Sequence, residues 1–325
     1  MHQSSSHTPS VFILLASYNG ENFIAEQINS ILTQTYSSWT LLIRDDGSTD
    51  TTLQIIQKLI GQDTRITLLN DVLGPSGSAT QNFSHLMEAG LQSEAEYFFF
   101  SDQDDLWHPE KIAQQLQVIE SMDNTRPCLA HHDLEVVDDK LNLLHASFFH
   151  RMRLRPNEAT FSSLLGRNEI TGGTMVCNRK LLEYASPIPE HVIIHDWWLA
   201  LICAATGNMK AIDAKLIKYR QHSNNEIGAK PFWDGLNPFT NWKERWEIRG
   251  KGLRNTITQA KALEGHFSKA SYAESLGTET VTKLNGYISL LDKPKLQRIK
   301  YAKENNLLTS HWLLRIAYKV RLLIL

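Results

Sequence analysis

Three aspartates fall within four residues, in Asp102-Gln103-Asp104-Asp105, directly after an apolar run. Carboxylates this close repel one another unless a positive charge lies among them. Hard oxygen ligands with open coordination positions suit Mg²⁺ or Mn²⁺ bridged to phosphates. The competing interpretation is an acidic helix N-terminus ahead of Pro109, where carboxylates favour the helix dipole. The residue types alone leave both interpretations open.

The elements that must position these carboxylates alternate between strand and helix through the first hundred residues. Continuous apolar runs predict buried strands, and apolar residues at helical spacing predict the helices between them. Repeated strand–helix units favour an α/β fold with a doubly wound, mostly parallel sheet. The expected strands cover residues 11–16, 39–44, 65–69 and 97–101, and the expected helices cover 21–34, 48–59 and 78–90.

Polar residues follow three of these expected strands. They are Ser17-Tyr18-Asn19 after the first strand, Asp45-Asp46 after the second and the 102–105 cluster after the fourth. In doubly wound sheets, ligands bind outside the carboxyl ends of the strands. We therefore expect the three polar groups to gather at one edge of the sheet and to form a ligand site.

The second half of the chain is less regular. A helix is expected over 109–121, and mixed strand and loop are expected to about residue 227, with strands at 129–137 and 210–219. Residues 230–242 hold two prolines, a glycine and two tryptophans, which favours a linker packed across the surface. From residue 243 the pattern is helical and forms a C-terminal helical extension.

Composition excludes several classes of protein. The chain has 325 residues with a formal net charge of −2, so no basic field indicates nucleic-acid binding. Three cysteines without metal-ligand spacing predict neither a disulfide framework nor a zinc site, which fits a reducing, cytoplasmic compartment. We expect a disordered tail over residues 1–9, no signal peptide and no transmembrane helix.

Three ordered segments resemble the signatures of the family 2 glycosyltransferases, which have the GT-A fold. They are Val11–Asn19, Asp45–Asp50 and Ser101–Trp107, and the resemblance covers roughly residues 10–225. The third segment, followed by Pro109-Glu110-Lys111, resembles the branch often labelled rhamnosyltransferases. The resemblance implies a catalytic domain over 10–228, followed by a linker and helical region over 229–325.

The resemblance also implies which residues hold a nucleotide-sugar donor. Ala16 and Tyr18 should frame the base, with Ser17 in the same turn and Tyr18 stacking on the base or flanking it. Asp46 should hydrogen-bond the base, with Asp45 beside it. Many relatives end the first strand in threonine or proline where this chain has Ala16, and a backbone contact can serve there.

Further residues are implied at the phosphate end of the donor. Asp102 should face the ribose or the metal, and Asp104 should ligate the Mg²⁺ or Mn²⁺ that bridges the phosphates. The segment after 210–219 resembles the Tyr-Arg-Gln-His segment of the branch, so Arg220 or His222 is expected at the diphosphate and His222 as an added metal ligand. Gly173 lies in a loop expected between donor and acceptor, where the alternative is a plain tight turn.

His195-Asp196-Trp197-Trp198 resembles the later acidic motif of the family, whose aspartate is the catalytic base. A sugar hydroxyl that attacks an anomeric carbon must lose its proton, and a positioned carboxylate accepts it. One carboxylate and one metal suffice for inversion. The alternative is that Asp196 caps a helix over 197–205 while the tryptophans fill the core.

The last 33 residues, 293–325, carry five Lys and three Arg against one Glu, a net charge of +7. A basic amphipathic helix lies on anionic membrane surfaces, which would suit a lipid-linked acceptor and peripheral placement on the inner face of the plasma membrane. The alternatives are packing on the catalytic domain or on a partner chain, as in a homo-oligomer.

The sequence predicts an inverting, metal-dependent glycosyltransferase of bacterial surface-polysaccharide type. The expected donor is a UDP- or dTDP-sugar, such as dTDP-rhamnose, and the expected acceptor is a glycan or lipid-linked glycan. The alternative is a non-catalytic sugar-nucleotide-binding or assembly protein with the same fold. A nicotinamide-dependent oxidoreductase would need Gly-x-Gly-x-x-Gly after the first strand, where this chain has Ser17-Tyr18-Asn19-Gly20-Glu21.

Overall fold

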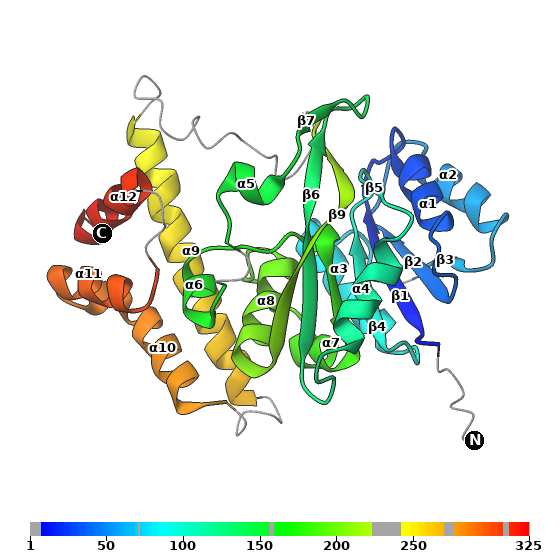
Figure 1. Cartoon of the computed structure of the whole chain (residues 1–325). Helices are drawn as coiled ribbons and strands as arrows, with labels where there is room; N and C mark the ends of the chain where they lie inside the picture. The colour runs from blue at the N-terminus through cyan, green and yellow to red at the C-terminus, as the bar shows by residue number, and fades with distance from the viewer. Residues whose placement is uncertain are drawn as a thin grey trace.

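The structure is a computed structural model that describes residues 8–70, 72–155, 159–222, 242–269, 276–307 and 312–324. A nine-stranded sheet forms its centre, with helices on both faces (Figure 1). The strands are β1 Val11–Ser17, β2 Trp39–Asp45, β3 Ile66–Leu68, β4 Tyr97–Ser101, β5 Leu106–Trp107, β6 Cys128–Val137, β7 Leu143–His145, β8 Met175–Asn178 and β9 Asn208–Arg220.

The first four strands form the parallel part of the sheet, in the order β3-β2-β1-β4. Strand β8 joins this part to β6 through antiparallel pairs on both of its sides. Strand β6 pairs in parallel with β9 and antiparallel with β7, and β5 pairs antiparallel with β9. The predicted α/β architecture is confirmed, and the four strands predicted from apolar runs all lie in the parallel part.

Alternate residues of the central strands face two separate cores. Ile13 and Leu15 of β1 pack with one group of helices, and Leu14 between them packs with the other. Helices α1, α2 and α4 cover the first face, whereas α3, α7 and α8 cover the second. The helices of this half are α1 Ile24–Leu32, α2 Thr52–Ile60, α3 Ala79–Gly90, α4 Lys111–Glu120, α5 Phe148–Met152, α6 Phe161–Gly166, α7 Arg179–Ala185 and α8 His195–Thr206.

The middle of the chain contains more helix than the sequence predicts. Residues 138–155 and 159–207, expected as mixed strand and loop, contain α5 to α8 and a 3-10 turn at Gly172–Thr174 in addition to β7 and β8. Three of the helices begin at side chains that accept a hydrogen bond from the first turn, namely Ser147, Thr160 and Asn178. Helices α5, α6 and α7 span only five to seven residues, too few to show a clear apolar period.

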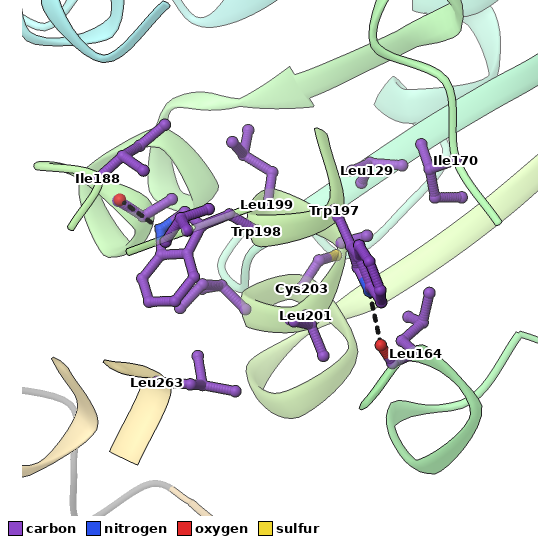
Figure 2. Packing of buried hydrophobic residues seen from close by; sticks show 14 of the residues in the cluster. Leu129, Leu164, Ile170, Ile188, Trp197, Trp198, Leu199, Leu201, Cys203 and Leu263 are labelled. Carbon is purple, nitrogen blue, oxygen red and sulfur yellow. Dashed lines mark hydrogen bonds between the residues drawn. The ribbon is translucent and has the colours of Figure 1, made fainter. Parts of the chain in front are cut away.

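Helix α8 lies inside the protein, and this burial fixes the segment that carries Asp196. Figure 2 shows Trp197 and Trp198 pointing to different sides of the helix among buried aliphatic side chains. The Trp197 indole donates to the carbonyl of Leu164 at 2.6 Å, and the Trp198 indole donates to the carbonyl of Ala185 at 2.9 Å. A helix that is apolar on all sides is stable only when its neighbours surround it.

The C-terminal helices complete the core on the same side as α8. They are α9 Trp242–Lys269, α10 Thr278–Ile288, α11 Lys295–Glu304 and α12 Trp312–Ile324, drawn in yellow to red in Figure 1. Leu263 of α9 and Tyr287 of α10 are fully buried in the cluster that contains Trp198. Gln259 of α9 accepts a hydrogen bond from the backbone of Ile193, just before α8. These helices therefore support the N-terminal end of α8 as well as one another.

The predicted disordered tail, the predicted linker and the predicted absence of a transmembrane helix concern the remaining parts of the chain. Most of the expected disordered tail and nearly all of the expected linker, residues 1–7 and 230–241, lie outside the described residues. Within the described ranges, no helix combines the length and the apolar character that crossing a membrane requires.

Candidate functional site

The carboxyl ends of β1 and β2 are joined by side-chain contacts. The Ser17 hydroxyl donates to Asp45 Oδ1 at 2.8 Å, and the backbone N–H of Asp46 donates to the carbonyl of Ser17 at 2.8 Å. Asp45 also accepts hydrogen bonds from the backbone and hydroxyl of Ser48, which shapes the turn after β2. The first two polar groups predicted from the sequence thus lie side by side at one sheet edge, with Ala16 half-buried in β1 beside them.

Gln103 connects the third polar group to the first. Its side-chain amide donates to the carbonyl of Tyr18 and accepts from the Tyr18 N–H, both at 2.8 Å. A Cβ added to Gly20 would lie only 2.3 Å from Gln103 Oε1, so a side chain at this position would displace the Gln103 amide. The two hydrogen bonds from Gln103 fix the backbone of Tyr18, whereas the Tyr18 side chain stays exposed, with 56% of the residue accessible. The ring is therefore free to stack on a flat ligand.

Asp46 is nearly buried and is tied to the loop that precedes α3. Its carboxylate pairs with Arg44 at 2.9 Å and accepts backbone N–H groups of Ser76 and Gly77 at 2.5 and 3.0 Å. Burial raises the pKa of Asp46, but hydrogen bonds from Ser76, Arg44 and Gly77 outweigh it and hold the pKa below its usual value. Asp46 is therefore a permanent anion that orders the loop before α3, beside the turn after β1.

The 102–105 cluster behaves as a group of mutually repelling carboxylates. Burial raises the pKa of Asp105 well above its usual value, and the charges of Asp104 and Asp102 raise it further. Gly173 lies against this cluster, because a Cβ there would be 3.2 Å from Asp105 Oδ2 and 3.8 Å from Asp102 Oδ2. The glycine permits the Gly172–Thr174 turn to approach the carboxylates closely.

Asp104 and His222 face each other across the sheet edge. His222 Nε2 lies 2.9 Å from Asp104 Oδ2, and both side chains are only 14% exposed. Two neighbouring ligands of an octahedral ion with bonds of about 2.1 Å are about 3 Å apart, so the pair fits a shared Mg²⁺ or Mn²⁺. Over the described ranges, no three His, Cys, Asp or Glu side chains converge as a preformed metal cage. An ion held here would take its remaining ligands from phosphate and water.

Arg220 occupies a different place from the one expected. Its guanidinium is 2% exposed, pairs with Glu26 at 2.5 Å and donates to the carbonyls of Asp104 and Asp139. It also lies over the ring of Phe23, with 4.5 Å from Cζ to the ring centroid. A direct contact with the diphosphate is therefore not what the structure shows, because the guanidinium is buried against protein groups. Arg220 instead holds the backbone of Asp104 in place.

Asp196 lies in the first turn of α8 and is 4% exposed. Its Oδ1 accepts from the Trp197 N–H at 2.5 Å and from Asn168 Nδ2 at 2.9 Å, and its Oδ2 accepts from the Gly172 N–H at 2.9 Å. Burial raises the pKa of Asp196 to about 7, although these hydrogen bonds oppose the rise. Ile194 occupies the N-cap position, so the carboxylate lies inside the helix rather than at its cap.

The neighbouring His195 differs from Asp196 in its surroundings. Its ring stacks on Phe83 with 3.9 Å between centroids, and neither ring nitrogen has a hydrogen-bond partner among the described residues. Burial lowers the pKa of His195 to about 3, so the imidazole is neutral near pH 7. Of these two residues, only Asp196 has a pKa suited to accepting a proton at neutral pH.

The Gly172–Thr174 turn lies between Asp196 and the 102–105 carboxylate cluster and contacts both. Its Gly172 donates to Asp196, and its Gly173 lies against Asp102 and Asp105. Asp133 accepts hydrogen bonds from the Ser147 hydroxyl and from the backbone N–H of Phe149, so its carboxylate is engaged in structural contacts. A pocket of about 410 Å³ between α6, α8 and α10 contains none of the predicted site residues.

Sequence reasoning missed three residues that support the site. Gln103 was assigned no role within the acidic motif, although its position beside Asp104 could have drawn attention to it. Asn168 and Arg44 gave no signal, because each acts through a carboxylate that folding brings beside it. Arg44 also donates to Asn82 of α3 and to the carbonyl of Gly74.

Comparison with solved structures identifies the fold. The chain is similar to Staphylococcus aureus TarS in complex with UDP, at 16% identity and a TM-score of 0.53, over 96% of this chain and 88% of that one. It is also similar to the mannosyltransferase PcManGT from Pyrobaculum calidifontis in complex with GDP-Man and Mn²⁺, at 18% identity and a TM-score of 0.51, over 98% and 86%. At these identities the likeness shows the GT-A fold alone.

Sequence comparison identifies the family. The chain is 28% identical to the dTDP-rhamnosyl transferase RfbG of Shigella flexneri, over 77% of this chain and 84% of that protein. It is also 28% identical to the UDP-Glc:alpha-D-GlcNAc-diphosphoundecaprenol beta-1,3-glucosyltransferase WfgD of Escherichia coli, over 77% and 88%. Residues 12–184 match the family described as glycosyl transferase family 2. The chain therefore belongs to glycosyl transferase family 2 and is a glycosyltransferase with the GT-A fold.

Proposed function

We propose that this glycosyltransferase transfers a sugar, with inversion, from a UDP- or dTDP-sugar to a glycan acceptor in bacterial surface polysaccharide synthesis. The observation that carries the proposal is the Gly172–Thr174 turn, which joins Asp196 to the 102–105 cluster. The candidate base thus lies next to the candidate phosphate end of the donor. The names of the Shigella flexneri and Escherichia coli relatives support both nucleotide classes, and dTDP-rhamnose is one such donor.

The nucleoside of the donor is proposed to bind at the ends of β1 and β2. The half-exposed ring of Tyr18 stacks on or flanks the base, and Ala16 and Ser17 offer backbone contacts in the same turn. Asp46 hydrogen-bonds the base beside the loop that its own carboxylate orders, with Asp45 fixing the turn. Arg220 contributes by positioning Asp104 rather than by touching the diphosphate.

The diphosphate is proposed to lie over the acidic cluster with Mg²⁺ or Mn²⁺ held by Asp104 and His222, and with Asp102 at the ribose or metal. A bound divalent ion would neutralise the charge that develops on the leaving diphosphate. The mutual repulsion of the three carboxylates supports this assignment, because a cation removes it.

The reaction proposed is a single displacement. The oxygen of an acceptor hydroxyl bonds to the anomeric carbon while the bond from that carbon to the diphosphate oxygen breaks, and its electron pair leaves with the nucleoside diphosphate. The hydroxyl proton passes to Asp196, whose pKa of about 7 suits a general base. Attack from the face opposite the leaving group inverts the anomeric configuration.

The acceptor is proposed to be a glycan, including one carried on a lipid diphosphate. The Escherichia coli relative is named for an acceptor of that kind, GlcNAc-diphosphoundecaprenol. An enzyme with such an acceptor would work as a peripheral protein on the inner face of the plasma membrane. The 28% identity to this relative supports the class of acceptor, and experiment must identify the sugar and the linkage.

Donor hydrolysis tests the proposal most directly. Purified protein is incubated with Mn²⁺ and a panel of UDP-, dTDP- and GDP-sugars, and the release of nucleoside diphosphate is measured. We expect slow hydrolysis of one donor, lost with chelator and in Asp104→Ala. His222→Ala should raise the Mn²⁺ concentration needed for half-maximal hydrolysis. His150→Ala, which replaces an exposed histidine on α5, should leave that concentration unchanged. The absence of both turnover and binding across the panel would overturn the proposal.

A further inference from the structure

Helix α12 presents an apolar face to solvent. Ile316, Val320 and Ile324 are four residues apart, which places them on one face of the helix, and they are 51%, 37% and 59% exposed. We call these three residues the α12 stripe. The opposite face carries Leu322, which is fully buried in the core. The helix is thus packed on the protein by one apolar face and leaves a second apolar face uncovered by described residues.

A buried arginine fixes the orientation of this helix. Arg298 of α11 donates to the carbonyl of Leu322 at 3.1 Å and to the carbonyls of Leu291 and Lys293. Because the bond to Leu322 joins α11 to α12, the stripe cannot turn inward without breaking it. Figure 1 shows α12 at the outer side of the helical region, on the far side of α9 from the sheet.

Positive charge flanks the stripe on both sides. By helical geometry, Arg315 and Lys319 lie on one side of the stripe and Arg321 lies on the other. On α11, exposed Lys295 adjoins Leu296, which is 78% exposed. Residues 293–325 carry a net charge of +7, and because the whole chain carries −2, residues 1–292 carry −9. The apolar face and the positive charge therefore lie in the same part of the molecule.

We propose that the α12 stripe docks on an anionic lipid bilayer, with α12 in the plane of the interface and its flanking Arg and Lys at the headgroups. An interfacial helix combines an apolar face with basic residues in this way. The acidic remainder of the chain would be repelled by the same surface, which orients the enzyme with α11 and α12 toward the membrane. A second copy of the chain fits less well, because an isologous contact would bring two basic faces together.

This inference goes beyond the proposed reaction, because it concerns a surface that contains none of the proposed donor or acceptor residues. Binding to a bilayer would raise the encounter rate with a lipid-carried acceptor. It would leave the hydrolysis of a soluble donor unchanged. Failure of vesicle binding and failure of donor hydrolysis are therefore separate results.

Vesicle flotation tests the proposal with the full chain. We expect the protein to float with phosphatidylglycerol–phosphatidylcholine vesicles at low salt, to float less at high salt and to remain unbound with pure phosphatidylcholine. Ile316→Ser with Ile324→Ser should weaken binding by about tenfold, because the two exposed side chains would no longer be buried in the interface. Arg315→Glu with Lys319→Glu should weaken flotation with the anionic vesicles at low salt, because two positive charges beside the stripe are reversed.

A matched pair of valines provides the control. Val320 of the stripe and Val281 of α10 are 37% and 40% exposed, so the two serine substitutions remove similar exposed surface. We expect Val320→Ser to weaken flotation and Val281→Ser to leave it unchanged, with equal thermal stability of both variants. Equal flotation of the two variants, or no flotation of the wild type at low salt, would overturn the proposal. A dimer in light scattering that Ile316→Ser with Ile324→Ser dissolves would assign the stripe to a second copy instead.

Discussion

Two aspartates in different regions of the molecule have similar contacts and opposite pKa shifts. Asp46 at the end of β2 is 7% exposed, and Asp196 at the start of α8 is 4% exposed. Each accepts three hydrogen bonds from nitrogen donors. The pKa of Asp46 is nevertheless lowered, whereas the pKa of Asp196 is raised to about 7.

The balance between burial and hydrogen bonding differs at the two carboxyl groups. Burial is the largest effect on both carboxyl groups and disfavours the charged form in each. At Asp46, hydrogen bonds from Ser76, from the buried Arg44 guanidinium and from Gly77 outweigh burial. At Asp196, three hydrogen bonds from neutral donors do not outweigh it. Asp46 therefore stays ionised and orders a loop, and Asp196 can take up and release a proton near neutral pH.

The largest expected effect is on transfer in Asp196→Asn. Removal of a general base should lower the rate of transfer by about 10²–10⁴-fold, because the acceptor hydroxyl loses its proton acceptor. The affinity for the donor, measured by calorimetry, should stay near that of the wild type. In Asp46→Asn, by contrast, we expect donor affinity and stability to fall. Transfer by Asp196→Asn at a near wild-type rate would refute the assignment of the base.

The next effect is on stability in Arg44→Met. Without the guanidinium, Asp46 becomes a nearly buried and unpaired charge, so the free energy of unfolding at pH 7 should fall by about 3 kcal/mol. Urea denaturation measures this change. Arg65→Met is the matched control, since Arg65 pairs with Asp63 at a half-exposed position and its loss should cost about 1 kcal/mol or less. Equal losses in the two variants would contradict the account of Asp46.

The two carboxylates should also respond oppositely to pH. Transfer should rise about tenfold per pH unit below pH 7 and level off above it, because Asp196 must be ionised to act. The raised pKa of Asp196 means that its contribution to stability is greatest in acid and is lost as pH rises to about 7. The lowered pKa of Asp46 gives the reverse, a contribution lost as pH falls through the folded-state pKa. A pH–rate profile that is flat between pH 5 and 8 would refute the first expectation.

The smallest effect is expected from Asn168→Ala. This variant removes one of the three donors to Asp196, so the ionised form loses stabilisation and the pKa of Asp196 should rise further. Transfer at pH 7 should fall a few-fold and recover at higher pH, which a general loss of folding would not do. Asn142→Ala removes a similar Asn–Asp bond at an exposed turn and should leave the profile unchanged. No shift of the profile in Asn168→Ala would show that Asn168 does not position the base.

The strands and the acidic edge could be predicted because their signals are local. Tyr97–Ser101 was predicted with the same bounds as β4, and the runs at 11–16 and 39–44 differ from β1 and β2 by one residue. A fully buried strand needs a continuous apolar run, so its limits appear in the sequence. The turn after each strand then had to bring its polar residues to the same edge.

The contacts that tune these residues could not be predicted in the same way. Several of these contacts are hydrogen bonds between segments that are distant in the sequence. They join Gln103 to the Tyr18 backbone, Asn168 to Asp196 and the buried Arg220 to Glu26. The direction of the exposed face of α12 also depends on how α11 holds it. Periodicity shows that a helix has an apolar face but not which of its faces the rest of the protein covers.

By itself, the amino-acid sequence determined the order of strands and helices in the first half and the chemical types gathered at one sheet edge. Only the tertiary structure decided which carboxylate is a permanent anion and which has a pKa near 7. The physical reason is that a pKa depends on burial and on the charge of the nearest partners, and folding alone sets both. The sequence contains Asp46 and Asp196 as the same residue type, and their different surroundings give them different chemistry.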